Sequence, residues 1–203
     1  MKKTIRADFL VMTALLSGLS VLLMCLDFPV PFVPPYVKMD FSDLPVVLGG
    51  FLWGIPCGAI IAVLKILLNF VLTGTYSMGV GELANLTGSL CYMIPAVFLY
   101  RRFWRSRKGA VLSLTAGTVI VSAAIVLGDL WFFFPAYGRI LGLTEEALIA
   151  SGHAVNPAIN SMAQMMAYSL LPFNLLKYGL VSALAYVLYK RLKRLTSRQE
   201  ENL

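Results

Sequence analysis

Long apolar runs separated by short polar stretches dominate the chain. A helix needs about 20 apolar residues to cross the hydrocarbon core of a membrane. The second run is too short for this at about 1.5 Å per residue, so its helix should be tilted or extended by the preceding loop. We therefore predict an all-α integral membrane protein with six transmembrane helices in one domain, residues 1–203. The six apolar segments are 9–26, 44–54, 56–73, 80–100, 110–134 and 165–189.

Composition supports a membrane protein. Hydrophobic residues make up 59% of the chain and charged residues 13%. An average soluble domain is roughly 45–50% apolar and about 25% charged. A soluble globular domain is therefore excluded, and so is a disordered chain, which needs the opposite composition.

The positions of the basic residues explain the net charge of +7. A positive excess favours nucleic-acid binding in a soluble protein, but in a membrane protein it marks the cytoplasmic loops. With six crossings, the three basic regions lie on one side, so we predict cytoplasmic N- and C-termini and no nucleic-acid partner. These regions hold 13 of the 17 basic residues: Lys2, Lys3, Arg6, Arg101, Arg102, Arg105, Arg107, Lys108, Lys190, Arg191, Lys193, Arg194 and Arg198.

Ionisable residues inside apolar segments are the main candidates for function, because they are costly in a membrane. Counted from the basic ends, Glu82, Asp129 and Lys177 fall in the outer half of the bilayer on three segments. Asn85 shares a helix face with Glu82, and Asn174 with Lys177. This layout predicts a polar pocket open to the outside. The alternative is that these groups pair with each other or lie in interfacial water.

Lys65 lies near the middle of its segment. It is either a structural partner of a buried acid or a side chain that extends to the interface. Aromatic residues at the outer level have two interpretations as well. They form an interfacial belt, or some of them line a pocket for a planar heterocycle with a polar tail. They are Tyr76, Trp131, Phe132, Phe133, Phe134 and Tyr137.

Motifs of catalysis and of ATP hydrolysis are absent from the sequence. It contains no G-x-S-x-G, no H-E-x-x-H and no Gly-Lys dipeptide of a Walker A motif. With His153 as its single histidine, the chain gives no support to a His-based metal site. We predict neither an enzyme nor a metal protein, and active transport would take its energy from a partner or an ion gradient. An integral-membrane enzyme acting on a lipid-like substrate, with Glu82 and Asp129 as acid and base, is the weaker alternative.

Four strings resemble the substrate-binding (S) subunits of energy-coupling factor (ECF) vitamin transporters, most closely the riboflavin-specific ones. The resemblance follows nearly the whole chain in order. It implies a six-helix S-component bundle in a prokaryotic cell membrane, with a pocket near the outer face capped by the loop at about 27–44. The strings are LDFPVP at 26–31, VKMDFSDLP at 37–45, GVGELAN at 79–85 and PFNLLK at 172–177.

The resemblance also implies ligand and partners. Riboflavin would be the transported ligand, with no cofactor. A transmembrane coupling subunit and two ATPase subunits would supply the energy, and the S subunit would topple in the membrane to carry the vitamin inward. Small residues on the first helix, Ala14 and Gly18, would contact the coupling subunit. Riboflavin would be held by the loop backbone near Asp40 and Phe41 and by the side chains of Glu82, Asn85, Asn174 and Lys177.

Two features depart from the riboflavin-type pattern. Such subunits often have Asn six residues before the Pro that ends the fifth segment, but here Asp129 precedes Pro135. An ionised Asp only accepts hydrogen bonds, whereas Asn also donates. We hypothesise that Asp129 contacts the ligand and alters selectivity or pH dependence, either paired with Lys177 or protonated. This leaves another vitamin or a flavin analogue as an alternative ligand. The outer stretch 136–162 is longer than expected and has no predicted role.

Overall fold

The computed structural model describes residues 7–75 and 77–200, with side chains described as far as Tyr189. The N-terminal bases Lys2, Lys3 and Arg6 and the aromatic Tyr76 lie outside the described residues, as do the side chains of the C-terminal bases. The α-helices are α1 (Ala7–Cys25), α2 (Asp43–Trp53), α3 (Ile55–Thr73), α4 (Val80–Arg102), α5 (Arg107–Gly128), α6 (Phe134–Leu141), α7 (Glu145–Val155), α8 (Met162–Met165) and α9 (Leu171–Glu200). Two π-helical turns, η1 (Asp129–Phe133) and η2 (Met166–Leu170), and two strands, β1 (Phe28–Pro29) and β2 (Lys38–Met39), complete the described fold.

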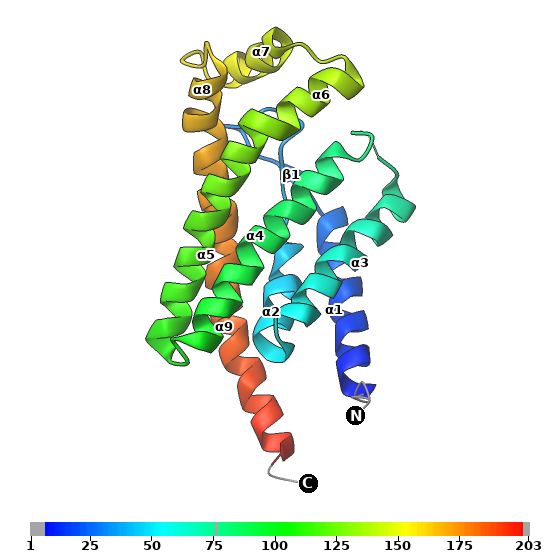
Figure 1. The fold of residues 1–203 in the computed structure, drawn as a ribbon, viewed down its shortest axis with the longest axis vertical. Helices are drawn as coiled ribbons and strands as arrows, with labels where there is room; N and C mark the ends of the chain where they lie inside the picture. Colours follow the sequence, from blue (N-terminus) through cyan, green and yellow to red (C-terminus); the bar gives the residue numbers. More distant parts are fainter. Residues whose placement is uncertain (1–6, 76, 201–203) are drawn as a thin grey trace.

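The long helices run along the long axis of the molecule as one bundle (Figure 1). Each of the six predicted segments forms a helix. Five helical stretches in the described part are long and apolar enough to cross a membrane: Ala7–Cys25, Ile55–Thr73, Val80–Arg102, Arg107–Leu141 and Met162–Tyr189. The second segment forms the 11-residue α2, as short as its sequence indicated.

Helix α2 lies inside the bundle, packed against α1, α3, α4 and α9. Apart from Asp43 at its start, its residues are apolar on all sides, which is typical of a buried helix, and Val46 and Val47 have no exposed surface. Glycine lets the neighbouring helix approach. A Cβ at Gly50 would lie 2.7 Å from Cγ2 of Val97 on α4.

The fifth segment continues beyond Pro135, and the prediction that this proline ends the helix was wrong. The helix passes through η1 into α6, and Pro135 lies in the first turn of α6. Proline lacks the N–H that would donate to the preceding turn, and the π-helical turn η1 just before Pro135 is where the helix departs from regular α-helical hydrogen bonding. The extra residue of a π-turn is often found at functional sites.

The outer stretch 136–162 forms most of α6, all of α7 and the loop into α8. Thr144 caps α7, since its hydroxyl oxygen accepts a hydrogen bond from the Ala147 N–H at 3.2 Å. These helices lie at one end of the bundle (Figure 1). The buried cluster beneath them consists of Phe134, Leu148, Ile159, Met165, Met166 and Leu170.

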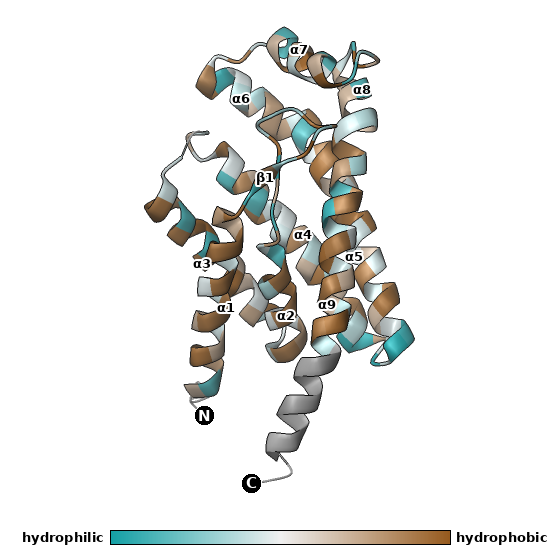
Figure 2. Ribbon diagram, turned by 180° about the vertical axis from the view of Figure 1, so that it is seen from behind, coloured by the Kyte–Doolittle hydropathy of each residue, from teal (hydrophilic) through white to brown (hydrophobic). Residues whose placement is uncertain are grey.

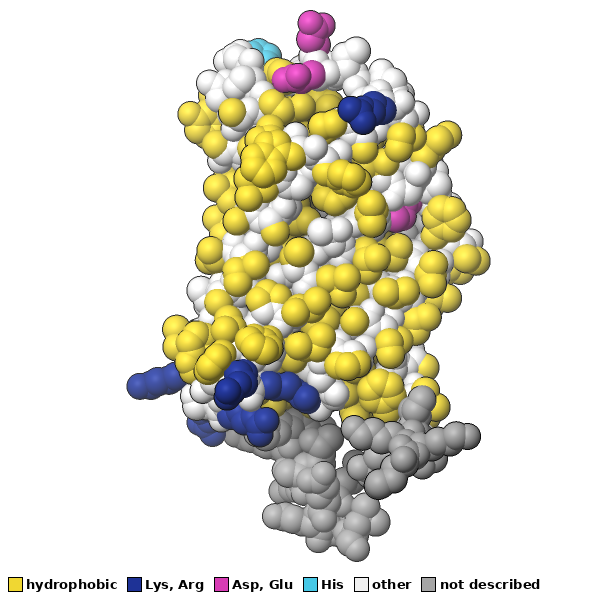
Figure 3. All heavy atoms as spheres, viewed as in Figure 1, with side chains coloured by type: hydrophobic (Ala, Val, Ile, Leu, Met, Phe, Trp, Pro, Cys, Tyr) yellow, Lys and Arg dark blue, Asp and Glu magenta, His cyan; other side chains and the backbone are white. Residues whose placement is uncertain are grey.

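Charge separates the two ends of the molecule. Basic side chains gather at the α4–α5 turn and acidic ones at the opposite end, while the surface between them is mainly apolar (Figure 3). Apolar residues extend along α1, α3, α4 and α5 (Figure 2). The start of α1 and the end of α9 lie at the same end as the α4–α5 turn (Figure 1).

Candidate functional site

The loop between α1 and α2 is partly buried: Val33 and Met39 are buried, whereas Leu26 is exposed. Prolines at 29, 31, 34 and 35 prevent a helix here, and the chain folds back on itself, with Phe28 opposite Met39 in the antiparallel β1–β2 pair. Ser169 in η2 anchors the loop by donating to the Phe32 carbonyl at 2.9 Å. Ser20 on α1 donates to the Ser42 carbonyl at the other end of the loop.

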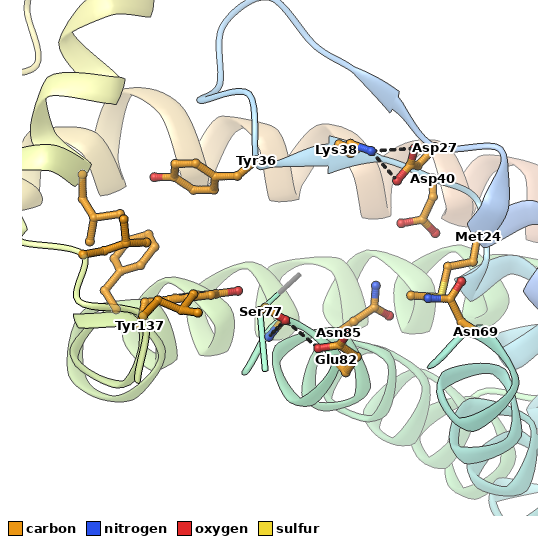
Figure 4. Close-up of a pocket in the computed structure, with 15 residues that line it drawn as sticks. Met24, Asp27, Tyr36, Lys38, Asp40, Asn69, Ser77, Glu82, Asn85 and Tyr137 are labelled. Carbon is orange, nitrogen blue, oxygen red and sulfur yellow. Dashed lines mark hydrogen bonds and ion pairs between the residues drawn. The ribbon is translucent and has the colours of Figure 1, made fainter. Parts of the chain in front are cut away.

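Two adjoining cavities lie between this loop and the helices. Their volumes are about 420 and 200 Å³, and the larger one is in the range of small-molecule sites, roughly 300–1,000 Å³. In Figure 4, Tyr36 and Asp40 from the loop lie on one side of the larger cavity, with Tyr137, Glu82 and Asn85 on the other. The residues that line both cavities are Tyr36, Gly81, Asn85, Phe134 and Tyr137.

The structure brings most of the predicted ligand residues together. Asp40 and Glu82 line the larger cavity, and Asn85 lines both. The smaller cavity is lined by Asp129, Asn174 and Lys177, which come from η1 and α9. Phe41 lines neither cavity. Its ring packs against the bundle core and lies 6.4 Å from the ring of Phe28.

An ion pair connects α9 to the loop. The Lys177 Nζ donates to Asp40 Oδ2 at 2.7 Å, with little of either side chain exposed. Burial raises the pKa of Asp40, but the charges of Lys177 and Lys65 outweigh this and lower it to about 2. Lys177 thus pairs with Asp40 and not with Asp129.

Several polar groups in the cavities have unused hydrogen-bonding capacity. Asn85 Oδ1 is buried and has no partner among the described residues. Among the described residues, the Asp129 carboxyl has no hydrogen-bond or ion-pair partner. Glu82 accepts a hydrogen bond from the Ser77 hydroxyl at 2.6 Å. Buried polar atoms are rarely left unpaired. These groups therefore favour a ligand with N–H or O–H donors.

The outer aromatics divide between the two interpretations. Phe134 and Tyr137 line the cavities, whereas Trp131 and Phe132 are 74% and 56% exposed, as in an interfacial belt. Phe133 is buried without lining either cavity. Some residues that line the cavities were not predicted from the sequence. The position of Tyr36 beside two prolines was a signal, and Phe173 lies in the PFNLLK string, but nothing in the sequence distinguished Ser77 or Tyr178.

Lys65 is a structural partner and does not extend to the interface. Its Nζ donates to Asp43 Oδ1 at 2.7 Å, and neither side chain has more than 1% of its surface exposed. Among the described residues, no group of three or more His, Cys, Asp or Glu side chains is placed to hold a metal ion.

Comparison with known proteins adds to this geometry. The family model described as "ECF transporter, substrate-specific component" matches residues 8–189. The chain is 30% identical to the riboflavin transporter RibU of Staphylococcus aureus over 93% of this chain and 92% of that one. It is 28% identical to the riboflavin transporter FmnP of Bacillus subtilis, over 91% of each. A solved S component of a bacterial ECF transporter superposes with a TM-score of 0.72 at 26% identity, covering 93% of this chain and 97% of that one.

Proposed function

Because the chain belongs to the family of substrate-specific components of ECF transporters, we propose that it binds riboflavin and delivers it across the cell membrane. Like the relatives that it matches, it is a transport component and not an enzyme. The weaker hypothesis of a membrane enzyme is thereby set aside. Two relatives that resemble it over nine tenths of the chain are named riboflavin transporters, which supports this ligand.

One observation carries the choice of ligand: the cavities have aromatic walls and unpaired polar groups at one place. Riboflavin is a flat tricyclic ring with an N–H between two carbonyls, and it carries a chain of hydroxyls. Tyr36 and Tyr137 offer ring surfaces. Asn85 Oδ1 supplies a buried acceptor for an N–H. The Nδ2 of Asn174 donates to the Leu170 carbonyl, which leaves the side-chain oxygen of Asn174 to accept from the ligand. Lys177 retains donors beyond the one given to Asp40.

The seven residues predicted to hold the ligand enter this proposal with different roles. Asp40 orients Lys177 and closes the cavity from the loop side, while Phe41 acts through the loop backbone. The remaining five present polar side chains to the ligand: Glu82, Asn85, Asp129, Asn174 and Lys177.

Orientation and partners complete the proposal. The basic α4–α5 turn faces the cytoplasm, with both termini, and α2 is the short sixth membrane segment. Energy comes from an ECF module with a transmembrane coupling subunit and two ATPase subunits, and the whole bundle topples to release riboflavin. Ala14 and Gly18 are exposed on α1, and a Cβ added at Gly18 meets nothing within 4 Å. A second helix packs closely against such residues.

A second candidate ligand is a flavin analogue or another vitamin, favoured by the unpaired carboxyl of Asp129. Titration of the detergent-purified protein with riboflavin, lumichrome and thiamine separates these cases. We expect riboflavin to bind most tightly, with quenching of its fluorescence by the cavity aromatics. Preferential binding of another compound would overturn the choice of ligand while leaving the family assignment intact.

A further inference from the structure

A hydrogen-bond network around residues 40–43 connects five helices: α1, α2, α3, α4 and α9. It begins at Lys65 on α3. The Lys65 Nζ contacts Asp43 Oδ1 at 2.7 Å and Ser42 Oγ at 2.9 Å. Ser89 on α4 donates to the same Asp43 oxygen, and Ser20 on α1 donates to the Ser42 carbonyl. Both ions of the pair are thus buried in the middle of the bundle.

The network continues from Ser42 to the cavity. The Ser42 N–H donates to Asp40 Oδ1 at 2.8 Å, and the Ser42 hydroxyl donates to the same oxygen. The other oxygen of Asp40 accepts the Lys177 ammonium at 2.7 Å. An unbroken path therefore leads from Lys65 on α3, through Ser42 and Asp40 in the loop, to Lys177 on α9.

Stability alone explains this network poorly. Two charges buried in the interior lose their hydration, and their attraction compensates for this only where all remaining polar atoms are satisfied. Here Asp43 Oδ2 is buried and has no partner among the described residues. Ionisable groups retained at such a cost inside a membrane protein commonly serve function. Lys65 lines neither cavity, so it does not touch the ligand.

We propose that Lys65 is a positioning residue, which sets the geometry of Asp40 and Lys177 at the ligand through the hydroxyl of Ser42. Lys65 holds Ser42 Oγ so that its proton points to Asp40, and Asp40 in turn fixes the Lys177 ammonium at the cavity wall. The pair with Asp43 anchors Lys65 itself. This inference rests on the proposed riboflavin function for its affinity readout.

Two serines provide a matched test. Ser42 and Ser89 are both fully buried, and each hydroxyl contacts one member of the Lys65–Asp43 pair. Only Ser42 is linked to Asp40. We expect Ser42→Ala to raise the riboflavin Kd by about tenfold, since it removes a hydrogen bond to a charged group. Ser89→Ala should keep the riboflavin Kd within about threefold of that of the wild type. We expect both substitutions to lower the melting temperature by similar amounts. Equal changes of Kd in the two variants would overturn the proposal.

A double variant separates positioning from folding. Lys65→Met with Asp43→Asn removes both charges, so no unpaired ion is left to unfold the bundle. We expect a monodisperse protein whose Kd for riboflavin is raised by about tenfold or more. Wild-type affinity in this folded variant would show that the pair serves packing only.

Hydrogen exchange of the ligand-free protein distinguishes failure of this inference from failure of the proposed function. Ser42→Ala should accelerate amide exchange in residues 38–44, whereas Ser89→Ala should not. If the wild type binds no riboflavin but this contrast in exchange is found, the ligand assignment fails and the positioning role stands. If riboflavin binds and the two serine variants exchange alike, the positioning role fails.

Discussion

Lys177 Nζ lies 2.7 Å from Asp40 Oδ2, and this contact joins two segments separated by 137 residues. One partner comes from the loop that covers the cavity and the other from the last helix. Because both are nearly buried, each keeps the other from being an uncompensated charge. The loop and the ligand site are therefore coupled through one ion pair.

Removal of the ammonium group should separate binding from overall fold. We expect Lys177→Met to weaken riboflavin binding by about 100-fold, because it removes a donor and leaves Asp40 unpaired. Fluorescence titration measures the effect. Arg139→Gln is the control, since Arg139 is exposed and lies outside both cavities. An affinity of Lys177→Met equal to that of the control would contradict this role.

The ion pair also predicts a pH dependence. The pKa of Asp40 is lowered from 3.8 to about 2, so ionised Asp40 stabilises the fold above its ordinary pKa, and this contribution is lost as the pH falls toward 2. The difference in melting temperature between wild type and Asp40→Asn should therefore stay constant from about pH 5 to 8 and shrink below about pH 4. A difference that disappears between pH 5 and 7 would argue against a lowered pKa.

Asn85 should show opposite effects on binding and stability. Its buried Oδ1 has no partner in the described part of the chain, so Asn85→Leu removes an unsatisfied acceptor. We expect roughly tenfold weaker riboflavin binding and a melting temperature equal to or above that of wild type. Thr87→Val on the same helix is the control, because Thr87 lines neither cavity. A loss of stability without loss of affinity would refute the assignment.

Asp129 should control selectivity. It and Glu82 are cavity carboxyl groups without a cationic partner among the described residues, so they disfavour the phosphate of a phosphorylated flavin. Asp129→Asn should improve the binding of FMN relative to riboflavin by about fivefold and alter the pH profile of binding. Glu146→Gln, at an exposed position, should change neither. An unchanged affinity ratio together with an unchanged pH profile for Asp129→Asn would eliminate the hypothesis.

The exposed small residues of α1 should affect transport and not ligand binding. We expect Gly18→Leu to retain the wild-type riboflavin Kd but to abolish uptake in cells that supply an ECF module, because added bulk prevents close helix packing. Val71→Phe, on the exposed part of α3, is the control for added bulk. Normal uptake by Gly18→Leu would remove Gly18 from the coupling surface.

The sequence predicted the helices better than their contacts. Hydropathy located all six segments, and helical spacing placed Glu82 with Asn85 and Asn174 with Lys177. The sequence did not reveal the partner of Lys177, because the contact with Asp40 depends on how the loop between α1 and α2 folds against α9. The extension beyond Pro135 was missed because a π-turn has no simple pattern, although Thr144 before two glutamates was a readable start of α7.

Riboflavin binding by this chain is best tested by the absorption spectrum of the protein purified in mild detergent from riboflavin-containing medium. We predict a yellow protein with the visible bands of a bound flavin, and extraction should release riboflavin in an amount close to one per chain. A colourless protein that also fails to bind added riboflavin would contradict the account.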